Sequence, residues 1–380
     1  MVVAVAAVVA TGSNVSCAGR TARAPAAVPA EPVVIIAAER GPDGARLVAI
    51  DEAGDRRFVL LTPPDGTVRD TNPTVSPDRQ WVVFASSRGR AVDQTSLWIA
   101  RLGVEAAPVR LTDGPAVETH PTWAPDGRSI VFASTRDGGD FDLWRLPIER
   151  GAAAGPPVQL TSAPGHEITP TIAPDGAIAF TALTIINDQE LESHLEVREP
   201  DGSIRRLTQG PADTSPAFAP DGRRIAFSRP QVHNGAVDAD LWLLDIGTAQ
   251  AVPIADVAKT DESGPAWSPD GRFVFATSLL RSSTGAALIS SIVHVDLSER
   301  RRKVRILMDR AGAVSRLTPA VVAPTLDTSA LRLGHEYLPT LARLVVRAAE
   351  RQIERHVDRD SSRDTKRERR ASPRTPANER

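Results

Sequence analysis

Five acidic residues recur through the middle of the chain, each three residues before a proline: Asp70, Glu118, Glu167, Asp213 and Glu262. Carboxylates gathered around one opening could bind a cation, a partner's Lys or Arg, or the N-terminus of a partner's helix. Alternatively, each carboxylate accepts hydrogen bonds from backbone N–H groups of its own loop and recurs because the loop recurs. The two interpretations are compatible, because one carboxylate can do both.

The residue immediately before each of these prolines differs from copy to copy: Asn72, His120, Thr169, Ser215 and Gly264. If the copies surround a channel, these residues lie slightly deeper than the carboxylates. The geometry then predicts a funnel with an acidic mouth and a floor that varies around the ring. The candidate ligand-binding residues are therefore the five carboxylates together with Asn72, His120, Thr169 and Ser215.

Other residues that could carry chemistry are sparse. The seven histidines form no His-x-x-x-His or His-Glu-x-x-His pair, so a zinc signature is lacking. His120 and His166 are the one pair expected near the same opening. The acidic turn at Asp137, Asp140 and Asp142 lacks the EF-hand pattern and is interpreted as a solvated turn. Without a Gly-x-Ser-x-Gly elbow or a phosphate-binding loop, the sequence predicts no cofactor, no metal ion and no catalytic residue.

The prolines belong to a longer repeat. Subtraction of their positions gives spacings of 48, 49, 46 and 49 residues between Pro73, Pro121, Pro170, Pro216 and Pro265. Each copy continues with a Pro-Asp-Gly turn (Pro-Asp-Arg in the first) and a phenylalanine, and several add Leu-Trp and a final Leu-Thr. Tight turns between β-branched and aromatic runs indicate short antiparallel strands. Four strands in a unit of this length are typical of a β-propeller blade.

These motifs resemble the β-propeller repeat of the TolB-like family. The resemblance implies an all-β, six-bladed propeller over residues 32–326, located in the periplasm and engaging envelope proteins through its channel mouth. The first blade, from Val33, has three strands and no Pro-Asp-Gly strand ahead of them. A degenerate copy of that strand follows the last full blade, at residues 317–324. We therefore expect this C-terminal strand to complete the first blade and close the ring.

Both ends of the chain differ from the repeats. Residues 1–17 are typical of a signal peptide ending in a lipobox, with Cys17 as the lipidation site, and residues 18–31 are expected to form a tether. Residues 327–357 carry apolar residues at roughly helical spacing and are predicted to be partly helical, as a short C-terminal helix. Residues 358–380 are a charged tail of composition typical of disorder.

The net charge of the 380 residues is −2, so no overall field favours nucleic acid or an anionic membrane. We expect a monomeric, non-catalytic propeller of the periplasm or outer membrane, anchored to a membrane only through a lipid at Cys17. Its expected ligand is an envelope protein. The alternative is a propeller hydrolase or lyase acting on polysaccharide or peptide, with a metal ion at the channel mouth.

Overall fold

The computed structural model describes most of the central part of the chain, namely residues 34–41, 44–51, 57–61, 63–102, 106–187, 190–210, 212–233, 236–255, 260–281, 287–298, 304–307 and 316–319. These residues form strands and turns, and none of them is helical. A helix able to cross a membrane is accordingly not found among them. The predicted signal peptide, Cys17, the tether, the helical segment and the charged tail lie outside the described residues.

The strands form six antiparallel sheets, here called blades 1 to 6 in chain order. Blade 1 has the strand order β25-β1-β2-β3, and blades 2 and 3 follow it along the chain. The strand bounds of these three blades are: β25 Arg316–Pro319, β1 Val34–Gly41, β2 Gly44–Asp51, β3 Arg57–Leu61; β4 Asp70–Val75, β5 Trp81–Ser86, β6 Ser96–Arg101, β7 Val109–Arg110; β8 Glu118–Trp123, β9 Ser129–Ser134, β10 Asp142–Glu149, β11 Ala152–Ala153, β12 Val158–Gln159.

Blades 4 to 6 each have four strands in sequence order, with the first strand innermost. Their hairpins between the second and third strands are longer than those of blades 2 and 3. The bounds are: β13 His166–Ile172, β14 Ile178–Asn187, β15 Glu190–Arg198, β16 Ile204–Arg206; β17 Thr214–Phe218, β18 Arg224–His233, β19 Ala236–Asp245, β20 Gln250–Ala255; β21 Thr260–Trp267, β22 Phe273–Arg281, β23 Ala287–Asp296, β24 Val304–Leu307.

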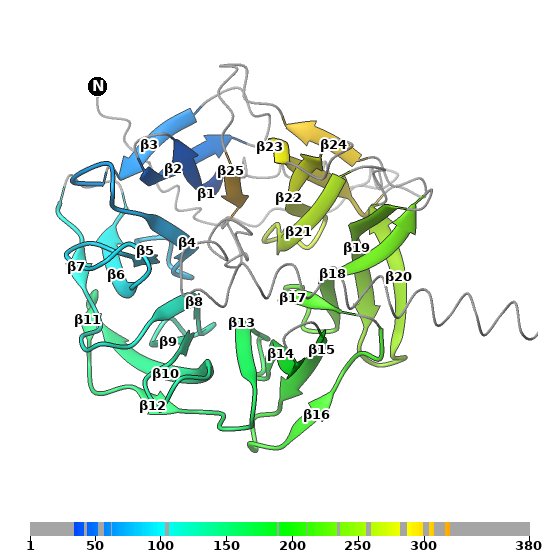
Figure 1. Ribbon diagram of the computed structural model, residues 1–380, viewed down its shortest axis with the longest axis horizontal. Helices are drawn as coiled ribbons and strands as arrows, with labels where there is room; N and C mark the ends of the chain where they lie inside the picture. Colours follow the sequence, from blue (N-terminus) through cyan, green and yellow to red (C-terminus); the bar gives the residue numbers. More distant parts are fainter. Residues whose placement is uncertain are drawn as a thin grey trace, which may run out of the picture. The chain divides into compact units, whose positions relative to one another are not determined.

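The six blades surround a common centre, with β25, β4, β8, β13, β17 and β21 innermost (Figure 1). The predicted closure is confirmed, because β25 pairs antiparallel with β1, from Ala37 opposite Pro319 to Arg40 opposite Arg316. Blade 1 thus combines strands from both ends of the described chain. The all-β, six-bladed propeller expected from the repeats is the observed fold.

The Pro-Asp-Gly motif forms the turn between the first and second strands of a blade. In blade 3 the Asp126 carboxylate accepts a hydrogen bond from the Arg128 N–H at 2.9 Å, and Gly127 has a φ of 68°. The aspartates of blades 2, 4, 5 and 6 accept the same bond from the residue two positions on. Blade 2 has Arg79 at the glycine position, with a φ of 58°, so the turn is retained despite the strain of a side chain there.

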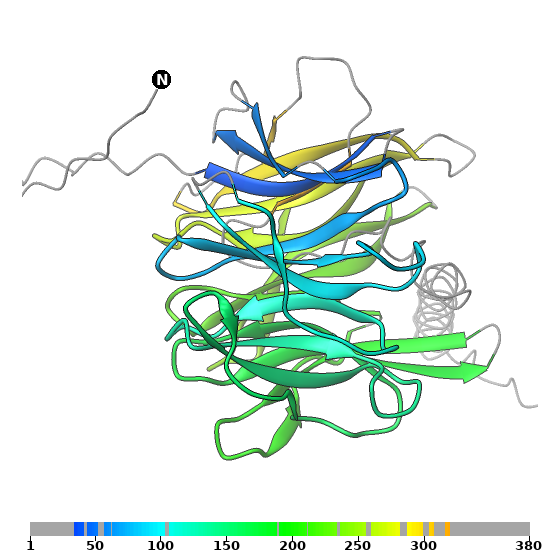
Figure 2. The ribbon, with the colours of Figure 1, turned by 90° about the vertical axis from the view of Figure 1, so that its left-hand side faces the viewer.

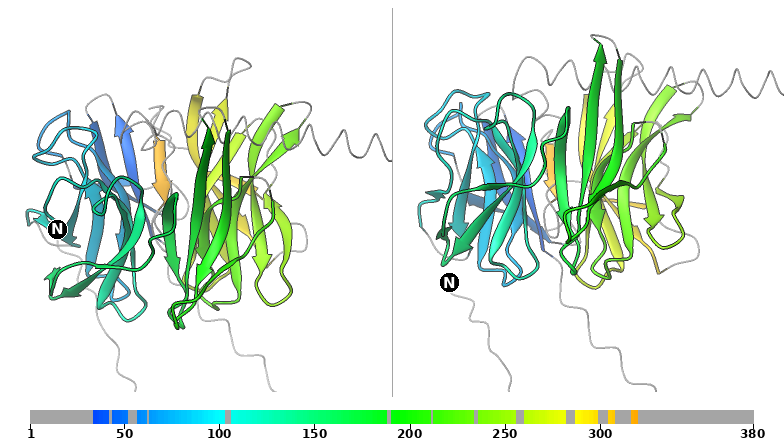
Figure 3. Two further views of the ribbon diagram at one scale, coloured as in Figure 1. Left: turned by 60° about the horizontal axis from the view of Figure 1, so that its bottom comes forward. Right: turned by 90° about the horizontal axis from the view of Figure 1, so that it is seen from below.

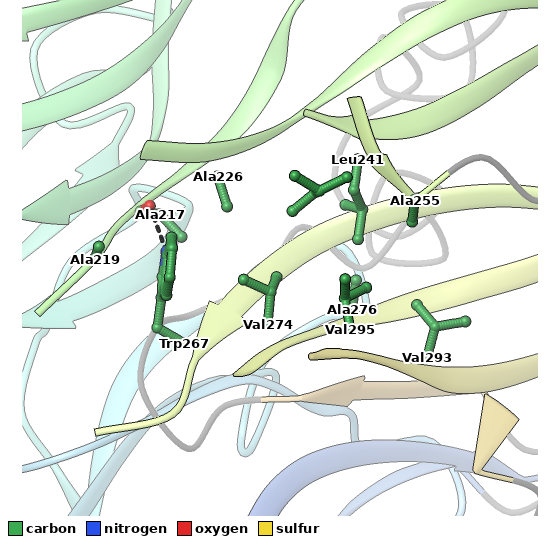
Figure 4. Packing of buried hydrophobic residues seen from close by; sticks show 11 residues of the cluster. Ala217, Ala219, Ala226, Leu241, Ala255, Trp267, Val274, Ala276, Val293 and Val295 are labelled. Carbon is green, nitrogen blue, oxygen red and sulfur yellow. Dashed lines mark hydrogen bonds between the residues drawn. The ribbon is translucent and has the colours of Figure 1, made fainter. Parts of the chain in front are cut away.

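The hydrophobic core lies between neighbouring blades, which stack face to face around the ring (Figure 2). The repeat phenylalanines are all buried in these interfaces: Phe84, Phe132, Phe180, Phe227 and Phe275. Between blades 5 and 6, Trp267 packs among small and branched side chains and donates its indole N–H to the Ala217 carbonyl at 3.0 Å (Figure 4). Repetition of this packing holds each inner strand against the next.

Candidate functional site

Each of the five inner strands from blade 2 to blade 6 is bulged next to its repeat proline. The pairing with the second strand shifts register there, for example between Thr119 and Thr122 in blade 3. In every case the residue before the proline has a positive φ: Asn72 48°, His120 50°, Thr169 54°, Ser215 55° and Gly264 60°. The predicted funnel-floor residues therefore share one unusual backbone conformation, at the same height in five successive blades.

This conformation costs free energy at four of the five positions, because a Cβ in the left-handed region approaches a neighbouring carbonyl and costs about 1–2 kcal/mol. Thr169 is the least favourable case, since β-branched residues rarely adopt positive φ. Strained residues persist where the surrounding structure enforces them, and they are concentrated at functional sites. Four strained residues in one ring, together with Gly264 in the same conformation, identify the bulges as the candidate site.

His120 is the most unusual member of this ring. It is 5 % exposed, and neither imidazole nitrogen has a hydrogen-bond partner among the described residues. Burial lowers the pKa of His120 to about 3, so the ring is neutral at physiological pH. The Ser215 hydroxyl is likewise buried, with no hydrogen-bond partner in the part of the chain that the structure describes. Unsatisfied buried polar atoms destabilise the folded chain and are therefore uncommon.

Other contacts tie the bulges of neighbouring blades together. The Thr119 hydroxyl donates to the Asn72 side-chain oxygen at 3.1 Å, which links blades 3 and 2. The Thr181 hydroxyl lies 2.7 Å from the Thr169 hydroxyl and accepts a hydrogen bond from the Ser215 N–H at 3.0 Å, which links blades 4 and 5. These hydrogen bonds connect the inner-strand bulges of blades 2 and 3 and of blades 4 and 5.

The five carboxylates are buried rather than open to solvent. Three of them pair with an arginine of their own blade. Arg88 contacts both oxygens of Asp70, and Arg136 contacts Glu118. The third pair, in blade 5, is bidentate: Arg229 Nε lies 2.6 Å from Asp213 Oδ1 and Nη2 lies 2.8 Å from Oδ2. These pairs hold the inner strand to the second strand or to the turn that follows it, and Glu118 also accepts hydrogen bonds from the Thr112 hydroxyl and the Leu97 backbone N–H.

Glu167 and Glu262 lack an arginine within the described residues. Glu167 hydrogen-bonds Asp142 of blade 3 and Thr161. Glu262 accepts from the hydroxyls of Thr260 and Ser278 at 2.6 and 2.9 Å, while its Oε2 is buried without a partner. Burial, and then nearby carboxylates, raise the pKa of each glutamate to about 8. Both are therefore partly protonated near neutral pH.

The paired arginines were not among the residues predicted from the sequence. A signal for them exists, because a basic residue follows the acid by 18 positions in blades 2 and 3 and by 16 in blade 5, as subtraction of the positions shows. The arginines also stack on aromatic rings; Arg229 lies 4.7 Å from the Trp242 ring centroid. The role of the carboxylates in ligand binding stays a prediction.

His120 and His166, the histidine pair expected near the same opening, have different surroundings. His166 Nδ1 accepts a hydrogen bond from the Phe141 N–H at 3.1 Å, and burial lowers the pKa of His166. Across the described ranges, no three His, Cys, Asp or Glu side chains are arranged to hold a metal ion. The ring centre instead offers neutral hydrogen-bonding groups.

The fold and the repeated inner-strand site define a propeller of tandem, similar blades. The sequence of residues 70–269 matches the family described as the TolB beta propeller domain. That match covers more than half of the 380 residues, and the chain belongs to this family. None of the curated proteins matches the chain.

Solved structures show the same fold at low sequence identity. A TolB-type protein from Agrobacterium tumefaciens is 18 % identical, with a TM-score of 0.55 over 76 % of this chain and 99 % of that one. TolB from Acinetobacter baumannii is 17 % identical, with a TM-score of 0.55 over 78 % of this chain and 65 % of that one. Hydrazine synthase from Kuenenia stuttgartiensis is 14 % identical, with a TM-score of 0.56 over 78 % of this chain and 47 % of that one. At these identities the likeness extends to the fold alone.

Proposed function

We propose that this protein is a non-catalytic binding module of the bacterial cell envelope, which holds a protein ligand at the centre of its ring. The observation that carries the proposal is the ring of strained inner-strand residues. Asn72, His120, Thr169, Ser215 and Gly264 share a backbone conformation but differ in side chain. A shared backbone with varied side chains suits recognition of one asymmetric ligand.

The chemistry of this ring favours binding over catalysis. A general base needs a pKa near the working pH, whereas the pKa of His120 is about 3. Its neutral imidazole can still donate one hydrogen bond and accept another. Membership of the TolB family supports an envelope location, and the signal peptide predicted to end at Cys17 supports attachment through a lipid.

The test is capture of the ligand by the full-length protein in a bacterial envelope. His120→Leu keeps the volume of the side chain and removes both nitrogens, and we combine it with Asn72→Ala. We expect the double variant to lose the proteins that co-purify with wild type after crosslinking. The melting temperature of the ring should fall only modestly: neither His120 nitrogen has a hydrogen-bond partner among the described residues, whereas Asn72→Ala removes the hydrogen bond from the Thr119 hydroxyl.

Val109→Ser is the matched control, because Val109 lies on the outer strand β7 and is exposed. Its captured proteins should equal those of wild type. If the double variant folds and captures the same proteins as wild type, the ring centre is not the binding site. If the wild-type protein is found only in the cytoplasm, the envelope assignment is wrong.

A further inference from the structure

A backbone hydrogen bond brings two acidic side chains together between blades 3 and 4. The Glu167 N–H donates to the Phe141 carbonyl at 2.6 Å, so Asp142, the next residue of blade 3, lies beside Glu167. The two carboxyl groups hydrogen-bond each other, and the Thr161 hydroxyl lies 3.3 Å from Glu167 Oε2. Glu167 is 4 % exposed and Asp142 is 8 % exposed. The contact between these two side chains, here called the carboxyl contact, is therefore buried.

The carboxyl contact requires a proton. Ionised carboxylates can only accept hydrogen bonds, so a bond between Asp142 and Glu167 exists only while one of them is protonated. Two buried carboxyls this close repel each other strongly when both are ionised. Burial, and then the contact with Asp142, raise the pKa of Glu167 to about 8, in agreement with this geometry. The pair therefore holds one proton at neutral pH.

The interface between blades 2 and 3 has the same backbone contact with different side chains. There the Glu118 N–H donates to the Thr95 carbonyl at 3.0 Å, and the next residue is Ser96. The Ser96 hydroxyl accepts a hydrogen bond from Arg110 at 2.9 Å, and Glu118 pairs with Arg136. Arginines therefore stabilise the acid at this interface, whereas a proton does so between blades 3 and 4.

Neutral residues occupy the positions of these arginines around the carboxyl contact. Gln159 has the outer-strand position that Arg110 has in blade 2. Thr184, two residues beyond the strand partner of Glu167, has the position that Arg136 has in blade 3. Thr184 is exposed on the β14–β15 hairpin, which projects beyond the β9–β10 hairpin (Figure 3). This position can therefore accept a longer side chain.

The charged groups around the carboxyl contact favour retention of its proton. The titratable groups on the surrounding elements are Asp137, Asp140, Arg145, His166, Glu192, His194, Glu196 and Arg198. Arg198 Nε donates to the Leu160 carbonyl at 3.1 Å, and the Arg145 Nε has no hydrogen-bond partner among the described residues. Burial lowers the pKa of His166, so its ring is mainly neutral near pH 7. The nearby carboxylates raise the pKa of both members of the pair.

We propose that the carboxyl contact is a pH-sensitive device of the ring, through which blades 3 and 4 separate locally as the pH rises and the shared proton is lost. The pKa of Glu167 is about 8 in the closed contact against an ordinary value of 4.5. The closed state thus binds the proton more tightly, so it is most stable at low pH and loses this advantage as the pH rises towards 8. The device belongs to the ring itself and is independent of a ligand at the ring centre.

The test is hydrogen exchange of backbone amides in the purified full-length protein at pH 6 and pH 8. The reporter amides are Glu167 and Leu143, whose N–H donates to the Thr161 hydroxyl at 2.8 Å. The equivalent amides between blades 2 and 3, Leu97 and Glu118, are the matched control. After correction for the intrinsic pH dependence of exchange, protection of the reporters relative to the controls should fall at least about tenfold from pH 6 to pH 8. This ratio removes any change in the stability of the whole ring.

Two variants test whether the proton is the cause. Glu167→Gln keeps the shape of the side chain and donates an amide N–H to Asp142 without a titrating proton. Thr184→Arg places a guanidinium where blade 3 has Arg136. Each should reduce the change between pH 6 and pH 8 to less than about twofold. Glu192→Gln is the matched control, because it removes an exposed carboxyl opposite Thr184 on the same hairpin and should leave the change as in wild type.

A ratio of reporter to control protection that is equal at pH 6 and pH 8 would overturn the proposal, because the carboxyl contact would then open only with the whole ring. Retention of the wild-type pH dependence in Glu167→Gln would also overturn it, because another group, such as His194, would then be responsible. The crosslinking test of the ring centre changes none of these residues, so the two proposals can fail independently.

Discussion

At the scale of single residues, the main feature is how the buried inner-strand acids are neutralised. Asp70, Glu118 and Asp213 have an arginine partner, whereas Glu167 and Glu262 hold hydrogen bonds to hydroxyls or to another carboxyl. A buried carboxylate without a cation is stable only when protonated. The same repeat position therefore has an arginine partner in three blades and holds a titrating proton in two.

Glu262→Gln should change the pH dependence of stability. The pKa of Glu262 is about 8 in the folded protein against an ordinary value of 4.5. Between these values the folded chain binds the additional proton, so stability is greatest at low pH and declines as pH rises towards 8. Gln cannot lose a proton, and at pH 8 the variant should be more stable than wild type by at least about 1 kcal/mol. Urea unfolding at pH 5 and pH 8 measures this.

The free energy of unfolding of Glu262→Gln should still change with pH, because Glu167 also titrates with a pKa of about 8. The double variant with Glu167→Gln should lose most of the remaining slope. If the free energies of unfolding of wild type and Glu262→Gln change equally between pH 5 and pH 8, Glu262 does not hold a proton in the folded state.

Arg229→Met should be strongly destabilising. It removes the bidentate partner of Asp213, whose side chain is fully buried, and breaking a buried pair from one side costs about 3–5 kcal/mol. Adding Asp213→Asn should recover much of the loss, since no buried charge then remains. Arg205→Met is the control: its partner Glu199 and Arg205 itself are both solvent-accessible, and the expected loss is below about 1 kcal/mol. Equal losses for Arg229→Met and Arg205→Met would contradict this interpretation.

At the scale of the element, the inner strands differ from ordinary strands by their bulges. A bulge bends the strand and re-aims the side chain at that point. The repeated prolines and turns were evident from the sequence, but the left-handed residue before each proline was not. Gly264, and more weakly Asn72, are of residue types that favour positive φ. Thr169 and Ser215 adopt it because pairing with the second strand and packing against adjacent blades enforce it.

Gly264→Val should therefore destabilise the ring by about 1–2 kcal/mol or more, because a β-branched residue is forced into the left-handed region. Ser215→Gly should change the free energy of unfolding by less than about 0.5 kcal/mol. Relief of backbone strain is offset by the greater freedom of glycine in the unfolded chain, and the Ser215 hydroxyl has no partner to lose. The free energies of unfolding of Gly264→Val and Ser215→Gly, measured by chemical denaturation, test these expectations. A tolerated Gly264→Val would mean that the bulge is not conformationally demanding.

At the scale of the whole molecule, β25 joins the two ends of the ring. Its pairing with β1 gives blade 1 its inner strand, and a closed ring leaves no inner edge unpaired at this point. We therefore expect the stability of every interface between blades to depend on β25, although β25 is distant in the sequence from most of the blades.

Deleting residues 315–326 should lower the melting temperature of the entire ring in one transition, by more than about 5 °C, since loss of one strand costs more than about 1–2 kcal/mol. Differential scanning calorimetry measures this. Removing the residues after 357 is the control, because that change leaves β25 intact. A deletion variant that melts like wild type would show that closure by β25 contributes nothing to stability.

Cys17→Ala should release the protein from membranes if Cys17 carries a lipid. Fractionation of a bacterial host that expresses the full-length chain, with the acyl mass measured on residue 17, tests the anchor. Wild type should fractionate with membranes and the variant should be soluble, because stable attachment depends on the hydrophobic chains. A wild-type protein that is soluble and still carries residues 1–16 would contradict export.

The sequence alone determined the repeat, the four-stranded blade, the family and the closure by a C-terminal strand. These follow from turns and strand patterns that act over a few residues and recur at a constant period. Only the tertiary structure decided that the acids are buried, that Arg88, Arg136 and Arg229 pair with three of them, and that His120 has no hydrogen-bond partner within the described ranges. It also decided that blade 4 rises beyond blade 3. Such features depend on contacts between side chains of separate strands and neighbouring blades. The repeat period of the sequence does not specify which of these side chains are in contact.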